Sequence, residues 1–354
     1  MKKIHRIALI ALFLMLASTA AAVVYRPLVL SRDKPGPAPG IVETMIITTP
    51  GSATVRFRCP LDGEATTEQK GLRRPLAIMI ENHVDSRPQS SLIKACIVYE
   101  TVVEGGVTRF MAIYLHNDVD TIGPVRSARE YFVDLAKQYD AIYSHCGGPA
   151  TIRKVINNLA VADLDEFANS DAYWRIRGRK APHNLYTSTD NLWQKASKRK
   201  YKTDVFYQRP NFKDDEPIEM RPDTATVDIN FSKPAFSVHY EYNRQTNSYN
   251  RFMAGKPHID GVFNRQIKPK NIVIQYVPIS NIAKDPKGRV AVNLIGTGKA
   301  IVFQDGKVIQ ATWQRLMPTD LTRFYDTGGN EIEFNRGQTW IELVDQARMQ
   351  VTFR

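Results

Sequence analysis

The sequence contains little cysteine. Its 354 residues include three cysteines, Cys59, Cys96 and Cys146, and no C-x-x-C pair. An odd and sparse set of this kind indicates neither a disulfide framework nor a thiolate zinc site. Because Cys96 and Cys146 lie in apolar runs, we expect them to be small core residues.

Common catalytic and cofactor-binding motifs are also missing. The sequence has no nucleophile elbow, no P-loop and no dinucleotide-binding fingerprint, and the pair Gly105-Gly106 alone is a weak phosphate signal. The histidines show no H-x-x-x-H spacing, which argues against a zinc site. We therefore expect neither a metal nor a cofactor.

Acidic residues are fewer than basic ones. The chain has 36 Asp and Glu against 48 Lys and Arg, which gives a formal net charge of +12. This excess favours anionic surroundings such as teichoic acids, anionic lipid, acidic glycans or nucleic acid, and charge alone does not choose among them.

The N-terminal segment predicts export. Lys2, Lys3 and Arg6 precede an uncharged run of about 19 residues at 7–25, which fits either a signal peptide or an uncleaved membrane anchor. Both place the rest of the chain outside the cytoplasmic membrane, either anchored there or secreted, so nucleic acid is not an expected partner. No cysteine follows the run, which excludes lipid attachment at a lipobox.

The remaining chain divides by composition. A Pro- and Gly-rich spacer covers residues 26–70, and strands alternate with helical segments over residues 71–208. A proline-containing linker at 209–224 leads to short strands and hairpin turns over residues 225–354. The sequence thus predicts an α+β protein, with an N-terminal mixed α/β sheet domain and a β-rich C-terminal domain, sandwich or barrel-like.

The candidate site lies where two predicted strands, at 95–103 and 108–115, meet at Gly105-Gly106. This turn presents Glu104 and Arg109 at the rim of the sheet. A helix is expected soon afterwards, because Ser127 and Glu130 have capping-box spacing ahead of an amphipathic segment. Its N-terminus, with Arg126 and Arg129, would form an anion site.

Glu104 is the candidate general acid. Desolvation beside an apolar strand end would raise the pKa of its carboxyl group, whereas the alternative role is a salt bridge to Arg109. Glu100 lies about 13 Å away along the strand, too far for a glycosidase pair. Sugar cleavage would therefore need a second carboxylate, such as Glu81, Asp134 or Asp140, or the single acid of a lytic transglycosylase.

The N–H groups of the helix that Ser127 caps, together with the side chains of Arg126, Arg129 and Arg109, are expected to face one small pocket shared with Glu104 and His183. His183 is the candidate for proton transfer or binding, and His83 and His145 also end strands. The predicted ligand-binding residues are Asn82, Arg87, Arg109, Arg126, Ser127, Arg129 and Asn184.

Several unusual strings, in this order, resemble the YerB-like family of bacterial envelope lipoproteins. They are Glu81-Asn82-His83, Arg87-Pro88-Gln89-Ser90, Glu104-Gly105-Gly106-Val107-Thr108-Arg109, residues 123–129, Ala181-Pro182-His183-Asn184-Leu185-Tyr186 and Asn335-Arg336-Gly337-Gln338-Thr339-Trp340. The resemblance implies a domain of unknown function in two parts, outside the membrane. Family members commonly carry a lipobox cysteine, which this sequence lacks.

Two functional hypotheses follow. The first is an enzyme that cleaves peptidoglycan glycan, a glycosidase or lytic transglycosylase, with Glu104 as general acid. The second is a non-catalytic envelope module that binds an anionic cell-wall glycan or a partner protein and regulates cell-wall enzymes. A deep groove around Glu104 would favour the enzyme, and a shallow basic face would favour the binding module.

Overall fold

The computed structural model describes residues 57–204 and 210–354. Residues 55–354 form one compact unit, and its class is α+β, as the sequence predicts. The candidate membrane segment at 7–25 lies outside the described residues. Among the residues described, no helix is both long and apolar enough to cross a membrane.

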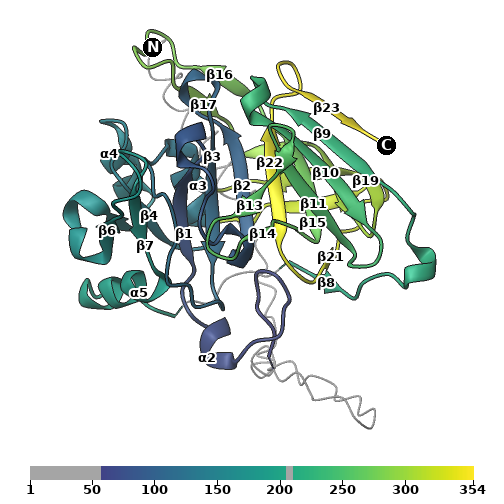
Figure 1. The fold of residues 1–354 in the computed structure, drawn as a ribbon, viewed down its shortest axis with the longest axis horizontal. Helices are drawn as coiled ribbons and strands as arrows, with labels where there is room; N and C mark the ends of the chain where they lie inside the picture. Colours follow the sequence, from purple (N-terminus) through teal and green to yellow (C-terminus); the bar gives the residue numbers. More distant parts are fainter. Residues whose placement is uncertain (1–56, 205–209) are drawn as a thin grey trace, which may run out of the picture. The chain divides into compact units, whose positions relative to one another are not determined.

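A ten-stranded mixed sheet joins the two halves of the sequence (Figure 1). Its strands, in spatial order, are β20 (Arg323–Asp326), β19 (Lys307–Arg315), β18 (Gly296–Gln304), β15 (Asn271–Tyr276), β22 (Thr339–Val344), β2 (Ile97–Val102), β3 (Thr108–Tyr114), β1 (Leu76–Glu81), β4 (Ile142–His145) and β5 (Ala162–Asp165). The connection between the halves is β22, which pairs in parallel with both β2 and β15.

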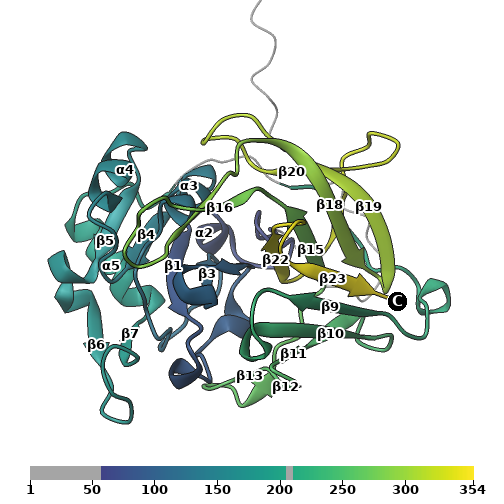
Figure 2. The same ribbon diagram turned by 90° about the horizontal axis from the view of Figure 1, so that it is seen from above.

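Four α-helices are described: α2 (Glu68–Gly71), α3 (Glu130–Gln138), α4 (Ile152–Asn158) and α5 (Thr189–Lys198). The helix α3 buries Phe132 and Leu135, as the predicted amphipathic spacing requires. The helix α5 begins after Ser188, whose hydroxyl accepts a hydrogen bond from the backbone N–H of Asn191. Figure 2 shows α3, α4 and α5 on the side of the sheet that ends in β4 and β5.

The C-terminal segment adds a five-stranded sheet of alternating buried and exposed residues. Its strands are β12 (Lys256–Pro257), β11 (Ser248–Met253), β10 (Ser237–Asn243), β9 (Thr226–Asn230) and β23 (Gln350–Phe353). The two-stranded pairs are β6 (Tyr173–Arg175) with β7 (Leu185–Thr187), β8 (Phe212–Lys213) with β21 (Phe334–Asn335), β13 (Ile259–Asp260) with β14 (Arg265–Gln266), and β16 (Ile279–Asn281) with β17 (Val290–Val292).

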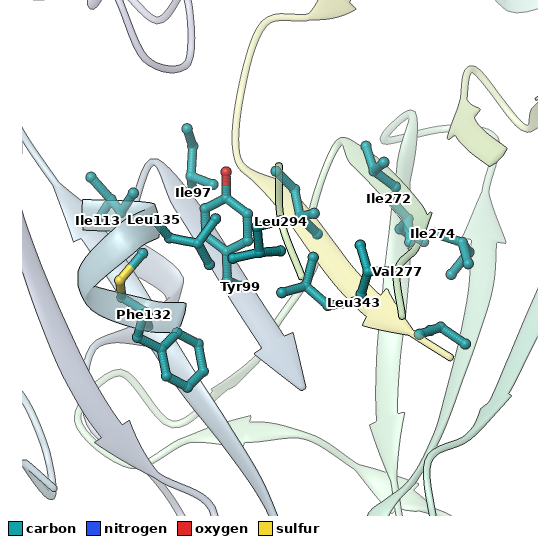
Figure 3. Close-up of a cluster of buried hydrophobic side chains, with 14 of the residues drawn as sticks. Ile97, Tyr99, Ile113, Phe132, Leu135, Ile272, Ile274, Val277, Leu294 and Leu343 are labelled. Atoms are coloured by element: carbon teal, nitrogen blue, oxygen red, sulfur yellow. The ribbon is translucent and has the colours of Figure 1, made fainter. Parts of the chain in front are cut away.

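One apolar core crosses the predicted boundary between the halves. Figure 3 shows Phe132 and Leu135 of α3 on one side of Tyr99, with Leu343 and Ile272 of the C-terminal segment on the other. All five belong to one cluster of buried side chains. The linker at 209–224 therefore marks a change in composition, while the sheet and the core continue across it.

Candidate functional site

The turn between β2 and β3 presents Glu104 as the sequence predicts. Residues 104–106 form a single 3-10 turn, in which Gly105 and Gly106 have φ angles of 68° and 74°. These left-handed angles favour glycine, whereas β-branched or bulky residues rarely adopt them. Glu104 is the second residue after the end of β2, and its side chain is 29% exposed.

Strand register places the next charged residues on the face that α3 covers. Glu81, the last residue of β1, pairs with Arg109 of β3, and Arg109 also pairs with Thr101 of β2. Residues directly opposite in a sheet point to the same face. The loop before α3 then brings Arg126 and Arg129 to these strand ends.

Glu104 is held by two arginines. Arg129 donates hydrogen bonds from Nε and Nη2 to the two carboxylate oxygens, and the Nε–Oε2 distance is 2.9 Å. Nη2 of Arg109 lies 3.8 Å from Oε1 of Glu104. Arg109 also donates from Nη1 to the carbonyl oxygen of Ser127, at 2.9 Å. The salt bridge between Glu104 and Arg109 that the sequence offered as an alternative therefore exists. The residue that binds the Glu104 carboxylate in a bidentate manner, however, is Arg129.

A second carboxylate, Glu81, joins the other predicted site residues. Its Oε2 is 2.9 Å from Nδ1 of His183, and its Oε1 is 2.9 Å from Nε of Arg126. The Arg126 contact is an ion pair rather than a hydrogen bond, because the Nε–H does not point at an acceptor. We call Glu81, Glu104, Arg109, Arg126, Arg129 and His183 the arginine cluster.

His83 and Asp85 border the arginine cluster beside His183. The rings of His83 and His183 stack, with centroids 5.0 Å apart and planes 14° apart, and Oδ2 of Asp85 is 4.0 Å from Nε2 of His183. Nitrogen lone pairs lie in the plane of the imidazole ring, so two stacked and nearly parallel rings do not converge on one ion. This trio is therefore a poor metal site despite its short separations.

The predicted increase in the pKa of Glu104 is wrong. Partial burial alone would raise this pKa, but the hydrogen bonds from Arg129 and the charges of Arg109 and Arg129 lower it to about 2. Glu104 is ionised near neutral pH, and it has no proton to donate as a general acid. Burial and the charge of Arg129 in turn lower the pKa of Arg109 to about 10, so Arg109 stays charged.

Ser127 does not cap the helix, contrary to the capping-box prediction. The residue at the N-cap of α3 is Arg129, and no side chain accepts a hydrogen bond there. The carboxylate of Glu130 instead accepts a hydrogen bond from the hydroxyl of Thr151. Ser127 contributes its backbone carbonyl, which fixes Arg109.

Three other predicted ligand-binding residues make different contacts. Asn82 follows Glu81 and is fully buried, with hydrogen bonds to Thr108 and Glu100. Arg87 donates to Asn82 and, at 2.8 Å, to the carbonyl of Ala235. Asn184 accepts from Arg175 and donates to the carbonyl of Ile176, which braces its own loop.

His145, the other histidine expected at a strand end, pairs with Asp163 at 2.8 Å and with the carbonyl of Gly147 at 2.9 Å. Both partners belong to its own region around β4 and β5. Its side chain is 1% exposed, so it is a core residue.

A groove of about 360 Å³ adjoins Arg129. Its walls come from the start of α3, the turn before α4 and the β16–β17 hairpin, including Arg129, Pro149, Thr151, Ile282 and Arg289. The hairpin belongs to the C-terminal segment. The contribution of this hairpin to the groove was not predicted, because no local sequence pattern links residues about 150 positions apart.

Comparison with known proteins gives the family. The N-terminal part, residues 61–202, matches the profile described as "Protein of unknown function (DUF3048) N-terminal domain", and residues 227–341 match the corresponding C-terminal domain. The chain is 34% identical over 301 residues to the "Putative lipoprotein YerB" of Bacillus subtilis (strain 168), covering 82% of this chain and 86% of that protein.

A solved structure agrees with the fold. The crystal structure of YerB protein from Bacillus subtilis aligns with a TM-score of 0.76 at 31% identity, over 84% of this chain and all of that one. Two matched segments in order, this level of identity and a shared fold show that the chain belongs to the DUF3048 family of YerB-like proteins.

Proposed function

We propose that this protein is a non-catalytic module, exposed outside the cytoplasmic membrane, that binds a carboxylate-bearing or otherwise anionic segment of the cell-wall glycan. The arginine cluster is its binding site. In this proposal the module positions the wall for, or regulates, enzymes that act on peptidoglycan.

The excess of positive charge in the arginine cluster carries the proposal. Three guanidinium groups, of Arg109, Arg126 and Arg129, face two carboxylates, of Glu81 and Glu104. In addition, Nε of Arg109 and Nε of Arg126 are buried without a hydrogen-bond acceptor among the described residues. Buried donors without acceptors are unfavourable, so these guanidinium groups keep hydrogen-bonding capacity that the protein itself does not use.

Four further observations support the proposal. The net charge of +12 suits an anionic matrix, and the N-terminal residues have the features of an export segment. The relative from Bacillus subtilis is named a putative lipoprotein, which places that protein at a membrane surface. The groove beside Arg129 provides space for a ligand larger than one acid group.

Co-sedimentation of the purified full-length protein with isolated cell walls tests the proposal. Arg126→Ala should weaken binding roughly tenfold, because a charge-assisted hydrogen bond contributes about 1.5–3 kcal/mol. The matched control is Arg153→Ala, since Arg153 is an exposed arginine of the nearby α4. Equal binding by both variants and the wild type would contradict the proposal. Because Arg126 also pairs with the buried Glu81, folding must be verified for each variant.

Glycan cleavage is a second candidate, with His183 in place of Glu104. Hydrogen bonding to Glu81 orients the imidazole of His183, as in acid–base sites. Incubating the protein with purified sacculi and identifying released muropeptides by mass spectrometry tests this alternative. Release by the wild type that disappears in His183→Asn, while Glu104→Gln remains active, would favour the enzyme over the binding module.

A further inference from the structure

Four potential metal ligands converge away from the arginine cluster. They are Cys59, Asp62, Cys96 and His116, and one ligand atom of each lies within 4.8 Å of all the others. The distance between Sγ of Cys59 and Sγ of Cys96 is 3.9 Å, and Nε2 of His116 lies 2.9 Å from Oδ2 of Asp62. No sequence pattern indicates this cluster, because the four residues span 57 positions without a familiar motif.

Three separate backbone segments hold these side chains in place. Cys59 and Asp62 belong to a tight turn, closed by a hydrogen bond from the backbone N–H of Gly63 to the carbonyl of Cys59. Cys96 directly precedes β2, where its N–H bonds to the carbonyl of Ile113. His116 lies two residues beyond the end of β3. The ligands are therefore positioned by the turn and by paired strands.

The distances suit a tetrahedral zinc ion. Zinc binds thiolate sulfur at about 2.3 Å and imidazole or carboxylate atoms at about 2.0–2.2 Å, so tetrahedral ligand atoms lie roughly 3.3–3.8 Å apart. The observed separations of 2.9 and 3.9 Å are close to this range. The remaining separations are at most 4.8 Å, so binding would draw these ligand atoms closer together.

Burial and ligand number indicate a structural site. Cys59, Asp62 and Cys96 are at most 3% exposed, and the His116 side chain is 12% exposed. Structural zinc sites are closed by four protein ligands, whereas catalytic ones leave a position for water. The N–H of Leu61 also points at Sγ of Cys59, at 3.4 Å, and such a hydrogen bond stabilises a thiolate.

We propose that Cys59, Asp62, Cys96 and His116 bind one structural Zn²⁺, which fastens the turn at residues 59–63 to the neighbouring ends of β2 and β3. Two thiolates, one carboxylate and one neutral imidazole supply the four bonds. The site is independent of the proposed wall binding, since it shares no residue with the arginine cluster. Its effect is on the stability of the turn that begins the described chain.

The competing arrangements are a metal-free hydrogen-bonded cluster and a disulfide between Cys59 and Cys96. A disulfide would require the sulfur atoms to move from 3.9 Å to about 2.05 Å. A metal-free cluster predicts no stoichiometric zinc in the reduced protein, so metal content separates it from the proposal. A disulfide is recognised instead by peptide mapping of the unreduced protein, because reduction would free both thiols.

The test uses the purified full-length protein, reduced, incubated with Zn²⁺ or Co²⁺ and then desalted. Elemental analysis should give one zinc per chain, and the cobalt form should show a sulfur-to-cobalt charge-transfer band. Cys96→Ser and His116→Ala should each lose this stoichiometric metal. Cys146→Ser is the matched control, because the third cysteine lies outside the cluster, and it should retain the metal.

Several results would overturn the proposal. Folded, reduced wild type that takes up neither metal is one, and metal retained equally by Cys96→Ser is another. Peptide mapping that finds Cys59 and Cys96 disulfide-linked in protein taken directly from the cell envelope is a third. If Cys96→Ser does not fold, the cobalt band of the wild type and the chelator-induced fall in its Tm still decide the question.

Discussion

Two groups of glutamate and arginine lie on opposite faces of the ten-stranded sheet, and they differ in charge balance. The arginine cluster has three arginines for two carboxylates. On the other face, Glu100 of β2 and Glu342 of β22 stand side by side in parallel register, and both face Arg251 of β11. We call Glu100, Glu342, Arg251, Tyr240 and His258 the buried network.

The pKa of a glutamate shifts in opposite directions in the two groups. Partial burial opposes the effect of the arginines on Glu104, but the arginines lower its pKa to about 2. Full burial, followed by the neighbouring charge of Glu100, raises the pKa of Glu342 to about 8. The number of arginines per carboxylate and the access of water decide whether the ionised or the protonated carboxyl group is favoured.

Most polar groups of the buried network have hydrogen-bond partners, unlike those of the arginine cluster. Arg251 donates to Glu100, to the hydroxyl of Tyr240 and to Nδ1 of His258, and Nε2 of His258 contacts Oε1 of Gln89 at 2.9 Å. Burial and the charge of Arg251 hold the pKa of His258 well below its usual range, so His258 stays neutral. This network joins β2 to the five-stranded sheet, and it is therefore structural rather than a ligand site.

The largest expected effect is that of Arg251→Met. Both Arg251 and Glu100 have fully buried side chains, so the substitution leaves an unpaired charge in the core. We expect a loss of about 3–5 kcal/mol in the free energy of unfolding, measured by denaturant titration. Adding Glu100→Gln should restore part of the lost stability, because it removes the unpaired charge. A loss below about 1 kcal/mol would remove the contrast between the two groups.

Glu342→Gln tests the raised pKa. The folded protein holds the Glu342 proton more tightly than the unfolded chain, whose value is near 4.5. The contribution of Glu342 to stability is therefore full below about pH 4.5 and is lost as the pH rises to about 8. Denaturant titrations across this range should show a smaller decline for Glu342→Gln than for the wild type. Parallel curves would contradict the raised pKa.

Glu104→Gln should show the reverse pH dependence. Because the folded pKa is lowered to about 2 from 4.5, the ion pairs of Glu104 stabilise the protein above about pH 4.5 and lose this effect as the pH falls toward 2. The side chain is partly exposed, so we expect a loss of only about 1 kcal/mol at pH 7. Thermal unfolding at pH 7 and pH 3 should show the variant and the wild type converging at low pH.

The smallest expected effect is that of Ser127→Ala. The structure uses the carbonyl of Ser127 and gives its hydroxyl no capping role, so stability should change by less than about 0.5 kcal/mol. Ser188→Ala is the comparison, since the Ser188 hydroxyl does cap α5 and its loss should cost about 1 kcal/mol. Equal costs for the two variants would restore the capping-box prediction.

Local sequence patterns predict the strands, the helix and the turn that carry the site. Alternating or continuous apolar runs gave β1 to β4 and the helix α3, because burial of one face leaves a periodic pattern in the chain. The left-handed turn at Gly105-Gly106 and the cap at Ser188 were also predictable, since both depend on local backbone requirements. The prediction that residues 225–354 are rich in strands rested on their hairpin turns.

The roles of the site residues depend on contacts between distant segments, which no local pattern predicts. Whether Glu104 is an acid or an ion-pair partner depends on Arg129, which reaches it from a loop 25 positions later. Glu81 and Asn82 are neighbours in sequence, yet strand alternation sends one to the arginine cluster and the other to the buried network. Sequence patterns record local periodicity, whereas a pKa or a ligand set depends on distances between segments that only folding fixes.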